Sequence, residues 1–131
     1  MSPNKFQKIR AAHDRETAED YVEMIQQLID DRRSARLTEL AKRFAVSAVT
    51  AHKIVARLKK EQLVDSQPYG ELFLTAKGQR LATESRVRHR LVLDFLCALG
   101  ITKQVAEIDA EGIEHHVSRQ TLEAFRRFLD K

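Results

Sequence analysis

Residues 38–60, TELAKRFAVSAVTAHKIVARLKK, predict two helices joined by a very short turn. Ser and Thr favour the N-cap position of helices, so we expect Thr38 to cap a short helix through Phe44 and Ser47 to cap a second helix through about Lys60. Only Ala45 and Val46 separate the two helices. This spacing is typical of a helix-turn-helix.

The flanking sequence extends this motif in both directions. Apolar residues recur at helical spacing from Ala18 to Ile29 and predict a preceding helix that ends near Asp30. After the motif, apolar residues 63–64 and 72–74 lie on either side of the turn sequence at 67–70, which favours a two-stranded β-hairpin. The order predicts a winged helix-turn-helix.

The remaining sequence is predicted to be helical. We expect Thr75 to cap a long helix that ends near Gly100, Thr102 to cap a helix through about His116, and Ser118 to begin a last helix through Leu129. Such a small segment cannot bury all its apolar residues alone, which favours dimerisation.

The predicted fold class is therefore mainly α, with three parts. Residues 1–12 form a mobile N-terminal arm, residues 13–77 a winged helix-turn-helix DNA-binding domain, and residues 78–131 a helical dimerisation domain with a metal site at the domain junction.

Composition excludes several classes of protein. The chain has 131 residues, of which 43% are hydrophobic and 32% charged, and it has one cysteine, Cys97. A single cysteine excludes an intramolecular disulfide framework and a cysteine-rich zinc site. No apolar run approaches the roughly 20 residues that span a bilayer. We therefore expect a cytoplasmic protein without a membrane partner or an organic cofactor.

The net charge of +4 is the sum of opposite blocks. Residues 32–60 contain nine Lys or Arg and one acid, which gives +8. Residues 14–31 contain one base and seven acids (−6), and residues 91–118 one base and five acids (−4). This distribution predicts a polyanionic partner for the middle of the chain and cations for the flanks.

Double-stranded DNA fits the basic middle. In a helix-turn-helix, the second helix enters the major groove and surrounding basic residues contact phosphates. Charged helix faces are usually only solvated, but the scarcity of acids here favours DNA binding. The candidate DNA-binding residues are Ser47, Val49, Thr50, His52, Lys53 and Arg57 on the second helix and Lys42 and Arg43 on the first.

The acidic flanks predict a divalent-cation site. Asp20 and Glu23 share a helix face, as do Glu111, Glu114 and His115, and like charges at this spacing are unfavourable unless a cation lies between them. His89 is a further donor. The spacing alone leaves a solvated helix face equally open. One alternative is a two-metal hydrolase, although the sequence has no visible phosphate-cradling loop. The other is a metal-independent winged-helix protein.

Several motifs together resemble the manganese transport regulators, the two-domain branch of the diphtheria toxin repressor family. They are Glu19–Glu23, Val46-Ser47 with Thr50, Leu74-Thr75 with Gly78, Arg88-His89, and Glu111–His116 (EGIEHH). The resemblance covers residues 13–128. Val49 departs from it, because many members carry Pro there.

The resemblance implies a homodimeric repressor, not an enzyme, that binds operators of manganese transport genes. The implied cofactor is Mn(II), two ions per subunit at a binuclear site of Asp20, Glu23, His89, Glu111, Glu114 and His115. Iron-sensing relatives carry Met at the position of Asp20 and Cys at that of Glu111, whereas oxygen ligands suit the harder Mn(II). Fe(II), Co(II), Cd(II) and Zn(II) are candidate substitutes, and an iron-responsive or other divalent-metal-responsive repressor of the same fold is the alternative. Metal binding is expected to order the dimer so that the recognition helices match major grooves roughly 34 Å apart.

Overall fold

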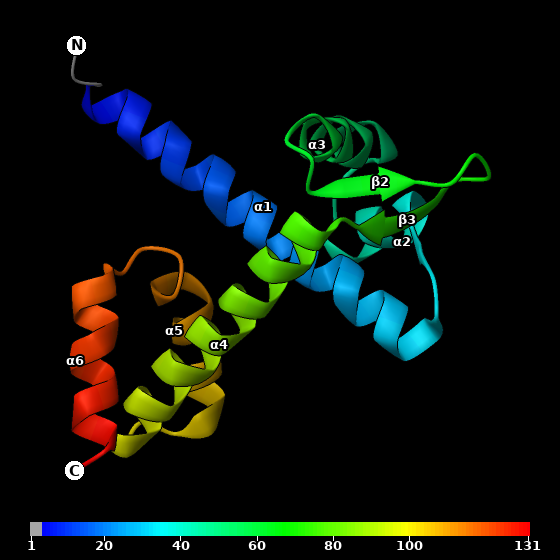
Figure 1. Cartoon of the computed structure of the whole chain (residues 1–131). Helices are drawn as coiled ribbons and strands as arrows, with labels where there is room; N and C mark the ends of the chain where they lie inside the picture. Colours follow the sequence, from blue (N-terminus) through cyan, green and yellow to red (C-terminus); the bar gives the residue numbers. More distant parts are fainter. Residues whose placement is uncertain (1–3) are drawn as a thin grey trace. The chain divides into compact units, whose positions relative to one another are not determined.

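The computed structural model describes residues 4–131, which divide into two compact units (Figure 1). One unit comprises residues 17–83, and the other comprises residues 84–131 together with the helical segment up to Glu16. Helices α1 (Lys5–Arg32) and α4 (Ala76–Ala98) each contribute residues to both units. Each unit is described separately.

The unit of residues 17–83 contains the predicted helix-turn-helix and its wing. The helices of the motif are α2 (Leu37–Arg43) and α3 (Ala48–Lys60). The wing strands β2 (Val64–Ser66) and β3 (Glu71–Leu74) are antiparallel, with Asp65 opposite Phe73. A third strand, β1 (Ala35–Arg36), pairs with the other edge of β3, which gives the order β1-β3-β2. The sequence pattern predicts only the two strands of the hairpin, so β1 is an addition to the expected wing.

Apolar side chains of α1 form the centre of this unit. Val22, Ile25 and Leu28 are fully or almost fully buried, together with Leu40 of α2 and Leu58 of α3. These positions of α1 recur every three or four residues, so one face of the helix is covered by the helix-turn-helix and wing. The ring of Tyr21 stacks on that of Phe44 with 4.3 Å between centroids. The core thus fixes α3 against a rigid support.

The unit that contains residues 84–131 has a much smaller core. Val92, Leu93 and Leu96 of α4 pack against Ala106 and Ala110 of α5 (Lys103–Ile113). Helix α6 (Arg119–Leu129) has no fully buried residue. It is anchored by the stack of Phe125 on Phe95, whose ring centroids lie 3.9 Å apart. At the end of α4, Gly100 has φ of 95°, as its predicted role as a helix cap requires.

Two helices begin at other residues than expected. Thr38 does not cap α2, because the helix begins at Leu37 after Arg36, which makes no side-chain cap. The pairing of Ala35 and Arg36 with β3 brings the chain directly from strand into helix. Residues 5–12, expected in a mobile arm, are helical. Asn4 and Gln7 exchange backbone-to-side-chain hydrogen bonds of 2.8 Å, a reciprocal cap that starts α1 early. Residues 1–3 of the expected arm lie outside the described residues.

Candidate metal centre and nucleic-acid interface

Three of the six predicted metal ligands meet in the unit of residues 84–131. His89 projects from α4 and Glu111 from the last turn of α5, and Glu114 is the C-cap residue that directly follows α5. His89 Nδ1 lies 3.2 Å from Glu114 Oε2 and 3.6 Å from Glu111 Oε1. One donor atom from each residue lies within 4.8 Å of the others. The three residues therefore offer one nitrogen and two carboxylate oxygens to a common centre.

Burial and charge act in opposite directions on His89. Burial of the ring disfavours the imidazolium and lowers the pKa of His89, whereas the hydrogen bond to Glu107 and the negative charges of Glu114, Glu111 and Glu107 raise it. The carboxylates prevail, so the pKa of His89 is raised above its ordinary value of 6.5. This is the electrostatic signature of a site that attracts positive charge.

Glu114 and His115 are the most deeply buried of the predicted ligands. The Glu114 side chain is fully buried, and His115 Nε2 lies 3.4 Å from Glu114 Oε1. A buried carboxylate is costly unless positive charge or hydrogen bonds compensate for it. The sequence predicted helix through about His116, but α5 ends at Ile113 and Glu114 is its C-cap. His115 therefore follows the helix and does not project from it.

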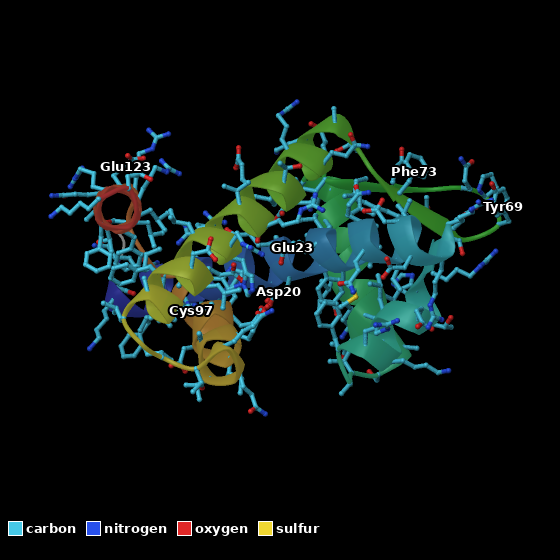
Figure 2. The ribbon with its side chains drawn as sticks, turned by 90° about the horizontal axis from the view of Figure 1, so that it is seen from below. Asp20, Glu23, Tyr69, Phe73, Cys97 and Glu123 are labelled. Atoms are coloured by element: carbon cyan, nitrogen blue, oxygen red, sulfur yellow. The ribbon has the colours of Figure 1, made fainter. Side chains whose placement is uncertain are left out.

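Asp20 and Glu23 belong to the unit of residues 17–83. Both are half-buried side chains of α1, and their three-residue spacing places them on one side of this helix, as Figure 2 shows. The structure thus bears out the predicted shared helix face for this acid pair. Cys97, also labelled in Figure 2, is an exposed residue of α4.

The donor set of His89, Glu111 and Glu114 fits a divalent cation. Carboxylate oxygens and imidazole nitrogen are ligands of Mn(II), Fe(II) and Zn(II), and the set lacks the thiolate that favours softer ions. The chemistry of the residues, with a fully buried carboxylate beside the imidazole, agrees with the implied metal.

Glu107 is not among the predicted ligands, although its side chain contacts one of them, His89. Its Oε2 lies 3.0 Å from His89 Nε2. Glu107 precedes Glu111 by four residues on α5, so the two share a helix face. The four-residue spacing of Glu107 and Glu111 can be read from the sequence. That Glu107 lies beside His89 of α4 can be seen only in the structure. His116, to which the sequence pattern assigns no role, forms a hydrogen bond with Glu16, with 3.0 Å between His116 Nε2 and Glu16 Oε2.

The predicted DNA-binding residues lie largely on the surface of α2 and α3. Val49, at the start of α3, is 64% exposed. Together with Leu37, Ala48, His52 and Lys53 it lines an open recess of about 410 Å³. An exposed valine beside a basic residue at the front of a recognition helix can contact a thymine methyl group.

Some of the predicted DNA-binding residues form hydrogen bonds or ion pairs within the protein. Ser47 accepts a hydrogen bond from the Thr50 amide at 3.1 Å, so it caps α3 as predicted. Arg43 pairs with Glu39 at 3.3 Å, and the half-buried Arg57 lies 3.8 Å from Glu61. Lys42, His52 and Lys53 are exposed. The exposed basic residues are therefore the stronger candidates for phosphate contacts.

No helix among residues 4–131 is both long and apolar enough to cross a membrane.

Comparisons with known proteins agree with both halves of this description. Residues 15–72 match the family described as "Iron dependent repressor, N-terminal DNA binding domain". Residues 75–131 match "Iron dependent repressor, metal binding and dimerisation domain".

Individual proteins are similar to this chain in sequence or in structure. The transcriptional regulator MntR of Escherichia coli O157:H7 is 47% identical over 126 residues, which cover 96% of this chain and 81% of the relative. A solved manganese-dependent transcriptional repressor in complex with manganese matches with a TM-score of 0.77 and 32% identity over 86% of this chain. The structure of ScaR with bound Zn²⁺ matches with a TM-score of 0.75 and 28% identity over 86% of this chain. The chain spans about half the length of these two structures, 52% and 53%.

Proposed function

Because the chain belongs to the iron-dependent repressor family of transcriptional regulators, we propose that it is a Mn(II)-dependent repressor of manganese transport genes. Members of this family are DNA-binding regulators and not enzymes. The observation that carries the proposed metal dependence is the meeting of His89, Glu111 and Glu114, with one imidazole nitrogen and two carboxylates within 4.8 Å.

Mn(II) is the proposed cofactor because the donors are hard. Manganese forms weaker complexes than the later divalent metals with most ligands, and oxygen-rich sites reduce that disadvantage. The MntR relative in E. coli and the manganese-bound repressor structure support this choice. Fe(II), Co(II), Cd(II) and Zn(II) are proposed as substitutes, and the ScaR structure with Zn²⁺ supports the last of these.

Asp20, Glu23 and His115 are proposed as further ligands on the strength of the sequence resemblance. With them, the chain has six donor residues, enough for two cations per subunit when carboxylates bridge. When bound, the metal supplies positive charge that offsets the carboxylates. The residues themselves contribute to selectivity, because carboxylate oxygens and imidazole nitrogens suit harder ions than a thiolate does.

The proposed active form is a homodimer on operator DNA in the cytoplasm. Residues 13–77 are the proposed DNA-binding domain, with α3 in the major groove, and residues 78–131 are the proposed dimerisation domain. A twofold dimer presents two recognition helices, so the operator is expected to contain two half-sites separated by about one helical turn, roughly 34 Å.

Fluorescence anisotropy on a DNA fragment from upstream of a manganese transporter gene tests the function. We expect Mn(II) to raise the affinity of the protein for this fragment and a chelator to reverse the effect. The Glu111→Ala variant should lose the response to Mn(II). Asp109→Ala is the matched control, because it removes an exposed acid from the same helix.

Each alternative predicts a different result in this titration. A response to Fe(II) without one to Mn(II) at equal free metal concentration would identify an iron-responsive repressor. Tight, sequence-specific DNA binding that persists in excess chelator would identify a metal-independent winged-helix protein. Neither result would be compatible with Mn(II) as the required co-repressor.

A further inference from the structure

The imidazole ring of His89 lies between acidic side chains on two of its edges. Glu111 and Glu114 face Nδ1 at 3.6 and 3.2 Å, whereas Glu107 faces Nε2 at 3.0 Å. All four residues belong to the unit of residues 84–131. Each nitrogen of the ring therefore has its own carboxylate environment.

We propose that Glu107 is a positioning residue for the metal ligand His89: its carboxylate accepts the Nε2–H, so that the Nδ1 lone pair faces Glu111 and Glu114. This inference rests on the proposed metal site. It adds a residue that contacts no metal but determines which nitrogen of His89 is the ligand.

The proton inventory of the ring supports this role. A neutral imidazole carries one hydrogen, and a carboxylate can only accept a hydrogen bond. The 3.0 Å contact with Glu107 is the shortest that His89 makes with an acid, and it favours the hydrogen on Nε2. The remaining lone pair then lies on Nδ1, beside the two carboxylates that share the centre.

The position of Glu107 argues against its being a ligand. The donor group within 4.8 Å comprises His89, Glu111 and Glu114, and among the described residues it does not include Glu107. Glu107 and Glu111 lie one turn apart on the same face of α5. Glu107 therefore lies beside Nε2 of the His89 ring, while Glu111 lies beside Nδ1. Histidine ligands commonly donate their second N–H to a carboxylate in this way, which fixes the ring orientation and raises its basicity.

Direct Mn(II) binding, measured by isothermal titration calorimetry on the full chain, tests the proposal. We expect Glu107→Ala to weaken Mn(II) binding by about 10- to 100-fold, the usual effect of losing such a partner. Glu107→Gln should recover most of this loss, because its amide oxygen still accepts from Nε2–H. Asp109→Ala is the control for loss of a negative charge on α5 and should remain within about twofold of the wild type. The side chain of Glu107 is 45% exposed, so the fold is expected to persist, and circular dichroism checks it.

Nitrogen NMR on the protein loaded with diamagnetic Zn(II) provides a second readout. In the wild type we expect His89 to bind the metal through Nδ1 and to retain a protected hydrogen on Nε2. In Glu107→Ala this hydrogen should exchange faster with solvent. A structural role of Glu107 alone would not change which nitrogen binds.

The outcomes separate this inference from the proposed function. Wild-type affinity in Glu107→Ala, metal coordination through Nε2, or a loss in Glu107→Gln as large as that in Glu107→Ala would overturn the positioning role, the last because it would indicate a charged ligand. If His89→Ala bound Mn(II) as tightly as the wild type, both the site and the positioning role would be wrong. Loss of binding in His89→Ala with unchanged binding in Glu107→Ala would overturn only the positioning role.

Discussion

At the scale of single residues, Gly78 occupies a position where no side chain fits. A Cβ atom there would overlap the carbonyl oxygen of Leu63 and contact Leu74. The close approach is fixed by Thr75, three residues earlier, whose hydroxyl bonds the backbone just before β2. By contrast, a Cβ atom at Gly112 on α5 would have no neighbour within 4 Å. Close packing therefore requires glycine at position 78 but not at position 112.

Replacing Gly78 by alanine should destabilise the protein by about 1–3 kcal/mol, because backbone must shift to make room for the methyl group. Gly112→Ala is the matched control, and we expect it to raise the free energy of unfolding by up to about 1 kcal/mol, since alanine is the better helix former. Denaturant unfolding monitored by circular dichroism measures both. Equal effects of the two substitutions would contradict the packing argument.

The pKa of His89 provides a second prediction at this scale. In metal-free protein the pKa should lie above 6.5, because the carboxylates outweigh the effect of burial. A raised pKa in the folded state means that the folded protein holds the proton more tightly. The contribution of protonated His89 to the stability of the folded protein is complete below the pKa of the unfolded state, and it is lost as pH rises through the pKa of the folded state. Glu107→Gln should lower the pKa, since it removes a charge and weakens the hydrogen bond. An NMR pH titration of metal-free protein checks this, and a pKa at or below 6.5 in the wild type would be inconsistent with the geometry.

At the scale of elements, the caps of the helices link them to the wing. The hydroxyl of Thr75 accepts from the Gly78 amide at 3.1 Å and lies 2.6 Å from the Gln62 carbonyl oxygen. It therefore starts α4 and also holds it to the chain that enters β2. Helix α3 begins in a similar way at Ser47, α5 at Thr102 and α6 at Ser118.

Thr75→Val removes these hydrogen bonds while keeping the shape of the side chain. We expect a loss of about 1 kcal/mol of stability, typical of a missing cap. Thr75→Ser should retain most of the stability, because it keeps the hydroxyl. Thermal unfolding of the three proteins compares them, and a valine variant as stable as the wild type would rule out a capping role.

Helix α3 leads to a prediction about DNA affinity. Lys53 is exposed, and each phosphate contact contributes about one to the slope of log affinity against log salt concentration. Lys53→Ala should therefore reduce the magnitude of that slope by about one on the operator fragment. Lys103→Ala, an exposed lysine of α5, is the control and should leave it unchanged. Anisotropy titrations at several salt concentrations provide the comparison.

At the scale of the whole molecule, the unit that contains residues 84–131 leaves much apolar surface uncovered. Ile108 is 71% exposed, Leu99 53%, Val105 49% and Phe128 44%. Helix α6 buries no residue fully within this unit. The family description of this region includes dimerisation, and a second copy of the chain would cover such a surface.

Ile108→Asp should shift the protein from dimer towards the monomer mass of 15.1 kDa, because it places a charge on the exposed apolar face of α5. Val49→Asp is the control, since Val49 is also an exposed apolar residue but lies in the DNA-binding unit. It should remain dimeric and lose DNA affinity. Light scattering after size-exclusion chromatography measures both masses, and a monomeric wild type would exclude the proposed dimer.

Local interactions made much of the architecture predictable from sequence. The caps Ser47, Thr102 and Ser118 and the turn after Gly100 act within a few residues, so their roles could be predicted without long-range contacts. The helical spacing of apolar residues on α1 was equally local. The same is true of the shared helix face of Asp20 and Glu23.

The amino-acid sequence by itself determined the helix-turn-helix, the separation of charge into a basic middle and acidic flanks, and the candidate ligands. Only the tertiary structure decided that Ala35 and Arg36 join the wing and that α2 therefore begins before Thr38. It also decided that Glu107 faces Nε2 of His89 while Glu111 and Glu114 face Nδ1. The reason is physical: caps and helix periodicity depend on neighbours in the chain, whereas strand pairing and the orientation of an imidazole ring depend on groups that folding brings from distant positions.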